Sequence, residues 1–265
     1  MLAGILLAAA ASVFAQTDNS RGPQEYATPS VVPPASPPRP TQAQFCDASS
    51  LPREKALATP RLRRLLTKGN DVRIAAFGSS TTMGQGASAQ ATAYPLQLQA
   101  ILRSALKHAY VNVDNMGAPG EIAAETAVRI LTELSSDPPG FLVWQVGVND
   151  GMNDTPVTRF ESVLRSTIDA TRRANVEMLL VGQQYTAKLA ANAHYTAIGR
   201  SIERVAREKG VAYVDSFAAM RAMVAVRGKE DMLSDDNFHL NDFGYRCLAE
   251  QIGKVIVDGL RAGNS

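Results

Sequence analysis

From residue 72 onward, short runs of consecutive apolar residues alternate with longer segments whose apolar residues recur at helical spacing. The runs that predict strands are VRIAAF (72–77), YVNVDN (110–115), FLVWQV (141–146), EMLLVG (177–182) and VAYVD (211–215). The predicted helices cover residues 94–108, 121–134, 156–174 and 191–210, and a last helix covers Asp242 to Gly259. Continuous apolar strands that alternate with amphipathic helices predict an α/β domain with a five-stranded parallel sheet covered on both faces.

The first fifteen residues, MLAGILLAAAASVFA, are an uncharged apolar run. The run ends in Val13, Phe14 and Ala15, with small residues at the positions that a signal-peptide cleavage site favours. A helix of this length would reach about 22 Å, short of the roughly 30 Å of a bilayer core. We therefore expect residues 1–15 to be a signal peptide, the protein to be secreted or periplasmic, and no stable membrane insertion. The run lacks an initial Lys or Arg, which leaves open a start further upstream or an apolar N-terminal helix.

A proline-rich stretch follows, because seven of the 14 prolines fall between Pro23 and Pro40. Such composition favours polyproline II or disorder over packing. We interpret residues 16–50 as a linker, residues 51–69 as a lead-in helix, and residues 70–265 as one folded domain.

The charge balance is nearly neutral, with 27 Lys and Arg against 25 Asp and Glu. This balance gives no broad basic surface for a phosphate backbone, so we expect no nucleic-acid partner and a small-molecule or glycan substrate. The chain has only three histidines, and any chemistry that needs an imidazole must use His108, His194 or His239.

Small and polar residues gather in the segments that follow the predicted strands. These segments are GSSTTMGQG (78–86), NMGAPG (115–120), GVND (147–150) and, near the C-terminus, DNFHLN (236–241). Ligands of parallel α/β sheets bind beyond the carboxyl ends of the strands. The four segments would therefore bring a serine, candidate oxyanion donors, an acid and a base to one edge of the sheet.

In these four segments the sequence resembles the SGNH hydrolases, also called GDSL-type esterases, over about residues 70 to 260. The resemblance implies a three-layer α/β/α sandwich of the flavodoxin-like type and a hydrolase that acts on ester bonds without a metal or organic cofactor. It also implies Ser80 as nucleophile, Asp236 and His239 as its acid and base, and the Ser80 N–H, Gly117 and Asn149 as oxyanion donors. Ser79 stands where the name-giving motif of the family has Asp, which makes Ser79 a rival nucleophile.

The same chemistry can be argued from the residues. A serine hydroxyl needs an adjacent base, and that base needs a third group to fix its tautomer. Asp236 and His239 are three residues apart and can form this pair within one turn. Asp150 and Asp215 remain alternatives for the acid, and GSSTT could instead be only a helix N-cap. Among the histidines, His108 is expected at a helix end and His194 on a helix surface or beside the cleft, which favours His239.

Motifs for nucleotide, metal and other hydrolase sites are absent or fit the sequence poorly. MGQGASA (83–89) contains a loose GxGxxA pattern, but the first glycine lies too far beyond the predicted strand for a dinucleotide fold. The sequence has no GxxxxGK[ST], HExxH or GxSxG motif, so we expect no nucleotide cofactor and no metal.

The two cysteines, Cys46 and Cys247, are too far apart for a CxxC motif. In an exported protein a disulfide between them would tie the N-terminal extension to the last helix. The alternative is two separate buried thiols.

We therefore predict a secreted, monomeric serine esterase that works through an acyl-enzyme. The loops after Gly84 and Asn149 show no obvious apolar lid, which favours short acyl groups such as O-acetyl groups on a glycan. Gln184 and Tyr185, after the fourth strand, are expected to line the cleft and bind substrate. The alternatives are an acyltransferase with the same triad, a lipase, lysophospholipase or thioesterase, and a glycan- or lipid-binding module without turnover.

Overall fold

The computed structural model describes residues 46, 57–69, 71–106, 109–229 and 231–262. The predicted signal peptide, nearly all of the predicted linker, and His108 lie outside these residues. The described part of the predicted lead-in helix contains the shorter helix α1 (Pro60–Thr67). Among the described residues, no helix combines the length and the apolar character that crossing a bilayer requires.

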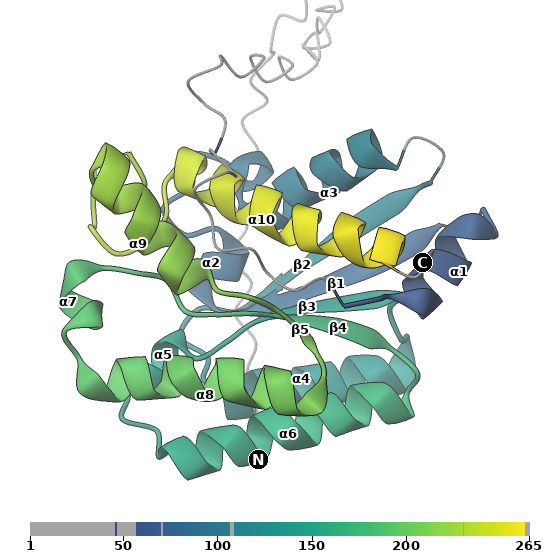
Figure 1. The fold of residues 1–265 in the computed structure, drawn as a ribbon, viewed down its shortest axis with the longest axis horizontal. Coiled ribbons are helices and arrows are strands. Elements are labelled where there is room, and N and C mark those ends of the chain that lie inside the picture. Colours follow the sequence, from purple (N-terminus) through teal and green to yellow (C-terminus); the bar gives the residue numbers. More distant parts are fainter. Residues whose placement is uncertain (1–45, 47–56, 70, 107–108, 230, 263–265) are drawn as a thin grey trace, which may run out of the picture. The chain divides into compact units, whose positions relative to one another are not determined.

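Five parallel strands form one sheet in the order β2-β1-β3-β4-β5 (Figure 1). The strands are β1 (Val72–Gly78), β2 (Val111–Gly117), β3 (Phe141–Gln145), β4 (Glu177–Val181) and β5 (Ala212–Val214). The predicted five-stranded parallel sheet is confirmed, and its strand order is that of flavodoxin-like folds. The chain places β2 on one side of β1 and β3 on the other, so the topological switch point lies between β1 and β3. Folds of this type bind their ligands at that point.

Helices cover both faces of the sheet (Figure 1). One layer contains α3 (Tyr94–Ala105), α9 (Ser216–Arg227) and α10 (Asp242–Arg261), and the other contains α4 (Ala123–Ser136), α6 (Val157–Arg173) and α8 (Ala193–Lys209). Alternate residues of β1 divide between the two cores, since Ile74 and Ala76 pack with the first layer and Ala75 and Phe77 with the second. This arrangement confirms the predicted three-layer α/β/α sandwich.

Four short elements lie in segments that the sequence pattern indicates only as loops. They are α2 (Ser80–Met83), the 3₁₀ turn η3 (Gln90–Thr92), α5 (Val148–Met152) and α7 (Ala187–Ala190). Each is too short to show a helical period, so no pattern could predict it. Two of them, α2 and α5, begin directly after β1 and β3 and carry two predicted site residues, Ser80 and Asn149.

Cys46 and Cys247 form a disulfide, with their Cα atoms 5.3 Å apart. Cys247 is buried in α10, and Cys46 is buried in the same core as the apolar residues of α10. The disulfide therefore ties the segment before α1 to the last helix, as the exported-protein interpretation predicts.

Candidate active site

The carboxyl ends of β1, β2 and β3 bring three of the four polar segments together. Ser80 is the first residue of α2 after β1, Gly117 is the last residue of β2, and Asn149 lies in α5 after β3. Because β1 pairs with both β2 and β3, these residues share one edge of the sheet. The fourth segment, which contains Asp236 and His239, precedes α10 and reaches the same edge.

Ser80, His239 and Asp236 form a continuous hydrogen-bonded chain. The Ser80 Oγ lies 2.9 Å from Nε2 of His239, and Nδ1 of His239 lies 2.6 Å from Oδ2 of Asp236. An ionised carboxylate only accepts hydrogen bonds, so Nδ1 carries the proton and Nε2 is left to accept the hydroxyl proton of Ser80. This arrangement is a nucleophile, a base and an orienting acid in contact.

Hydrogen bonds hold Asp236 in its ionised form although its side chain is 42% exposed. Partial burial works against ionisation, but the His239 ring, the N–H groups of Phe238 and His239, and the Ser234 hydroxyl outweigh it and lower the pKa of Asp236 below its usual range. The carboxylate is therefore ionised at neutral pH and available to the imidazole.

The loop that carries Asp236 and His239 is closed on itself. An isolated antiparallel bridge joins Leu233 to Leu240, and the Ser234 N–H donates to the His239 carbonyl at 2.9 Å. The side chain of Asn241 donates to the Leu233 carbonyl and accepts from the Gly244 N–H at the start of α10. Local contacts therefore set the acid and base relative to each other.

The rival residues from the sequence lie elsewhere. Ser79 precedes α2 as its N-cap residue, and Nε2 of His239 contacts the hydroxyl of Ser80. Asp215 caps α9 by accepting from the Ala218 N–H. His194 lies in the first turn of α8.

Asp150, the other alternative for the acid, is buried beneath the site and only 1% exposed. Its Oδ2 accepts from the Ala123 N–H at the start of α4, and its Oδ1 has no partner among the described residues. Burial raises the pKa of Asp150 to about 6, with repulsion from Glu125 adding to the effect and N–H donors opposing it. Asp150 thus joins α5 to α4 and lies away from the His239 ring.

Asn149 is the predicted oxyanion donor whose surroundings are best defined. Its Nδ2 donates to the Glu121 carbonyl at 2.8 Å, and an amide nitrogen carries a second hydrogen that this bond leaves available. The Glu121 carboxylate is held in turn by two hydrogen bonds from Arg129, at 2.8 and 2.7 Å. The Arg129 guanidinium lies over the Phe77 ring, 5.3 Å from its centroid. A chain of contacts from the core therefore orients the Asn149 amide.

Gly117 differs from the prediction in one respect. Its N–H donates to Oδ1 of Asn115 at 3.0 Å, so this predicted oxyanion donor is engaged within its own turn. A Cβ at Gly117 would lie 2.1 Å from the Met83 nitrogen, so glycine is required here for the close approach of β2 to α2. Gly120, next to Glu121, has an N–H with no acceptor in the described part of the chain. Sequence reasoning did not select Gly120.

Gln184 and Tyr185 have different surroundings. Gln184 is 2% exposed, accepts from the Thr81 hydroxyl at 2.7 Å and donates to the Phe238 carbonyl at 2.9 Å. The structure therefore corrects the expectation that Gln184 lines the cleft, because both ends of its amide connect α2 to the His239 loop below the surface. Tyr185 is half-buried and lines a cleft, with its ring edge-on to Phe217.

Gly86 is a further residue that the sequence analysis did not assign to the site. A Cβ at this position would lie 2.6 Å from the Leu240 carbonyl oxygen and 2.9 Å from the His239 Cβ. The GxGxxA pattern that fails as a dinucleotide motif therefore has a structural role, because one of its glycines lets the loop after α2 lie against the His239 loop. In the sequence, the spacing of the glycines could indicate a close backbone contact at this loop, but it does not show that the contact is with the His239 loop.

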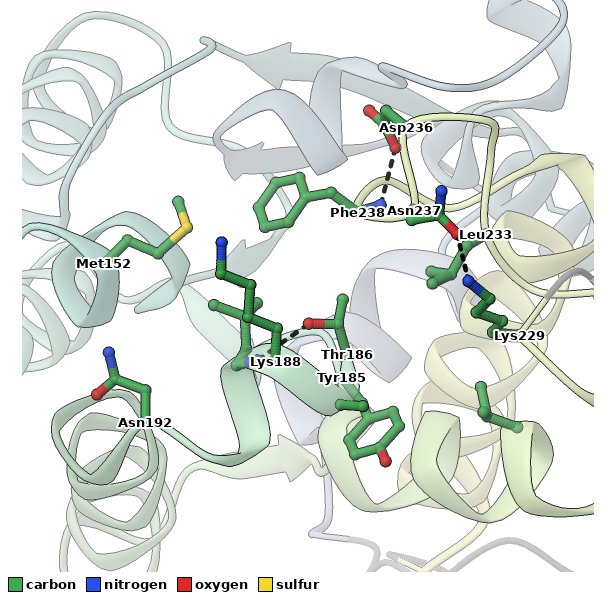
Figure 2. A pocket seen from close by; sticks show the side chains of 13 residues that line it. Met152, Tyr185, Thr186, Lys188, Asn192, Lys229, Leu233, Asp236, Asn237 and Phe238 are labelled. Atoms are coloured by element: carbon green, nitrogen blue, oxygen red, sulfur yellow. Dashed lines mark hydrogen bonds between the residues drawn. The ribbon is translucent and has the colours of Figure 1, made fainter.

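A cleft of about 720 Å³ opens beside the triad, and Figure 2 shows its lining. Its walls come from α5, the segment between β4 and α8, α9 and the loop that carries Asp236. The walls are mainly apolar, with Met152, Tyr185, Leu189, Leu233 and Phe238 among them. Apart from Met152, which follows Asn149 in α5, this apolar lining comes from segments later in the sequence, so the loops after Gly84 and Asn149 do not predict it.

The fold and the site define a hydrolase of the SGNH type, and comparison with known proteins agrees. Residues 45–262 match the model of the Non-GDSL lipase-like family. The chain belongs to the Non-GDSL lipase-like family, which confirms the predicted SGNH membership and an enzyme that acts on ester bonds. The absence of Asp at Ser79 is consistent with the name of this family. A search of curated proteins gave no match.

Solved structures share the fold at low sequence identity. TesA is 21% identical with a TM-score of 0.60, over 71% of this chain and 99% of TesA. A two-domain esterase (CEX) active on acetylated mannans, crystallised with mannopentaose, is 19% identical with a TM-score of 0.66, over 80% of this chain and 56% of the esterase. A variant of Axe2, an acetyl xylan esterase from Geobacillus stearothermophilus, is 18% identical with a TM-score of 0.60, over 70% and 94%.

Proposed function

We propose that the protein is a serine esterase that forms an acyl-enzyme on Ser80. The observation that carries this proposal is the 2.9 Å contact between the Ser80 Oγ and Nε2 of His239, with Asp236 on the other ring nitrogen. The Ser80 oxygen attacks the ester carbonyl while Nε2 takes the hydroxyl proton. The bond from the carbonyl carbon to the alcohol oxygen then breaks, and the His239 proton passes to the departing alcohol.

The second half of the reaction repeats these steps with water. His239 takes a proton from a water molecule, the resulting hydroxide attacks the acyl carbon, and the bond to the Ser80 oxygen breaks. The proton on His239 returns to Ser80, so the sum is ester plus water to acid plus alcohol. Asp236 stabilises the imidazolium in both halves because its lowered pKa keeps it ionised.

The negative charge on the tetrahedral carbonyl oxygen would be met by the Ser80 N–H, the second hydrogen of the Asn149 amide and one glycine N–H. Gly117 can be this donor only if the hydrogen bond from its N–H to Asn115 breaks when substrate binds. Gly120 precedes Glu121, whose carbonyl holds Asn149, and its N–H has no acceptor among the described residues, so we add it as a candidate donor. Loss of one such donor typically lowers kcat by about a hundredfold to a thousandfold.

We further propose a secreted or periplasmic location and short acyl esters as substrates, with O-acetyl groups on a glycan first among them. The disulfide supports export, because disulfides persist in oxidising compartments. Two of the fold neighbours are esterases of acetylated mannan and xylan, which makes acetylated polysaccharides the first substrates to test.

The test compares Ser80→Ala and His239→Ala with the wild type on para-nitrophenyl acetate, with Ser79→Ala as the matched control. We expect each of the first two variants to lose at least about a thousandfold in kcat, because removal of either group disables the triad. A fluorophosphonate should label the wild type and Ser79→Ala but not Ser80→Ala. Full activity in Ser80→Ala or His239→Ala would refute the proposal. Product analysis with an added polyol would show whether water or a sugar hydroxyl takes the acyl group.

A further inference from the structure

The cleft next to the triad has a charge pattern that the esterase chemistry does not use. Asp236 lines the cleft (Figure 2) and bonds to His239, so the cleft adjoins the triad at its acid. Three of the lining residues carry charge, namely Lys188, Lys229 and Asp236. The formal charge of the lining is therefore positive.

Two of these three charges already have partners. The Asp236 carboxylate receives hydrogen bonds from His239, Phe238 and Ser234. The Lys229 ammonium donates to Oδ1 of Asn237 at 2.8 Å. The Lys188 ammonium has no hydrogen-bond acceptor and no ion pair within the described ranges of the chain, so it is the one of these three charges without a hydrogen-bond partner.

The position of Lys188 is set by a defined local structure. Lys188 is the second residue of α7, whose start is fixed by the Thr186 hydroxyl, which accepts from the Leu189 N–H at 3.1 Å. In Figure 2 the Lys188 side chain extends from α7 toward the part of the cleft between Met152 and Phe238, and Lys229 lies on the other side beside Asn237. The Lys188 side chain is exposed, so an anion that enters the cleft from solvent can reach its ammonium.

We propose that this cleft binds an anionic group of the ester substrate, with the Lys188 ammonium as its charged contact. The inference rests on the proposed esterase function and names a substrate class for it, namely esters that carry a carboxylate beyond the scissile bond. The apolar walls would pack on the carbon skeleton that joins the ester to the carboxylate, which is the usual division of roles in ligand pockets. The carboxylate can belong to the alcohol half or to the acyl half of the ester.

The experiment uses two pairs of esters that differ only in charge. For the alcohol half, para-acetoxyphenylacetate is compared with para-acetoxyphenylacetamide. For the acyl half, the phenyl monoester of adipic acid is compared with the phenyl ester of adipamic acid. In the wild type we expect the anionic member of one pair to have a kcat/KM roughly tenfold above that of its neutral amide, as for a charge-assisted hydrogen bond.

The variants test whether this ratio depends on Lys188. Lys188→Gln should bring the ratio close to one, Lys188→Glu should invert it, and Lys188→Arg should retain most of it. The matched control is Lys68→Gln, an exposed lysine after α1, which should leave the ratio at its wild-type value. The wild-type ratio should also fall as salt is added, because salt screens the attraction.

The outcomes separate the inference from the esterase function. If the neutral esters are hydrolysed in a Ser80-dependent reaction but neither pair shows a preference for the anion, the inference is overturned and the function stands. A preference that survives in Lys188→Gln also overturns it. If no ester of either pair is hydrolysed in a Ser80-dependent reaction, the proposed function fails and the inference fails with it.

Discussion

The Glu121 carbonyl oxygen accepts a hydrogen bond from Nδ2 of Asn149 at 2.8 Å, and this contact joins the segment after β2 to the segment after β3. The carboxylate of the same glutamate is held by Arg129 and by the Thr126 hydroxyl. The orientation of a candidate oxyanion donor therefore depends on side chains of α4 that do not line the site.

The first prediction concerns Arg129. Arg129→Gln should lower kcat roughly tenfold with little change in KM, because a small displacement of Asn149 weakens contacts made only in the transition state. Arg129→Lys should recover part of the loss. Steady-state kinetics on para-nitrophenyl acetate gives both constants.

The matched control for Arg129 is Arg165→Gln, which removes an arginine that pairs with Glu208 between α6 and α8. This variant should retain the wild-type kcat. An equal loss of kcat in both arginine variants, or an effect of Arg129→Gln on KM alone, would contradict a positioning role.

The second prediction concerns Gly86, whose added Cβ would meet the His239 loop at 2.6 and 2.9 Å. Gly86→Ala should lower kcat roughly tenfold or more, because the two loops must move apart. Gly210→Ala is the control for backbone strain, since Gly210 also has a positive φ but nothing within 4 Å of a Cβ. The kcat and Tm of both variants are measured. Similar losses of Tm with a loss of kcat only in Gly86→Ala would agree with the prediction, whereas equal kcat values would reject it.

The third prediction concerns the pH dependence of stability. Burial raises the pKa of Asp150 to about 6 from its ordinary value of 3.8, so the folded state binds this proton more tightly than the unfolded state. The stabilisation is present below about pH 4 and is lost as the pH rises through about 6. In the wild type this loss lowers the free energy of unfolding by on the order of 3 kcal/mol. Asp150→Asn removes the titrating group and should therefore not show this loss.

Chemical denaturation at several pH values between 4 and 7.5 provides the check for Asp150. The free energy of unfolding of Asp150→Asn should increase relative to that of the wild type as the pH rises through this interval. Parallel pH profiles for the two proteins would show that Asp150 does not titrate differently in the folded state.

The fourth prediction concerns the disulfide, which closes a loop of 201 residues in the sequence. The chain-entropy model assigns about 5 kcal/mol to so long a loop. Cys46→Ser should therefore lower the Tm substantially while kcat stays close to wild type, because the disulfide lies away from Ser80 and His239. A reductant should lower the wild-type Tm by a similar amount and leave the Tm of Cys46→Ser unchanged. An unchanged Tm in Cys46→Ser would contradict the prediction.

The sequence predicted the sheet because each strand is a continuous apolar run and each main helix is long enough to show its period. The meeting of Ser80, His239 and Asp236 was predicted through the resemblance to SGNH hydrolases, whereas the residues alone left Asp150 and Asp215 open as the acid. The engagement of the Gly117 N–H by Asn115 could not be predicted, since it depends on one side-chain rotamer. The burial of Gln184 and the cleft between Lys188 and Lys229 depend on contacts between distant segments, which local pattern does not encode.

The triad has two parts, Ser80 on one side and the loop of Asp236 and His239 on the other, and different contacts position each part. The acid and base are set relative to each other by the Leu233 to Leu240 bridge and the bond from Ser234 to His239, whereas Ser80 is set by β1 and α2. The Gln184 amide and the close approach at Gly86 are two of the contacts that fix the separation of the two parts. A small displacement of one part would lengthen the contact between Ser80 and His239 without unfolding any helix or strand. We therefore expect activity to be lost before any change in folding can be measured.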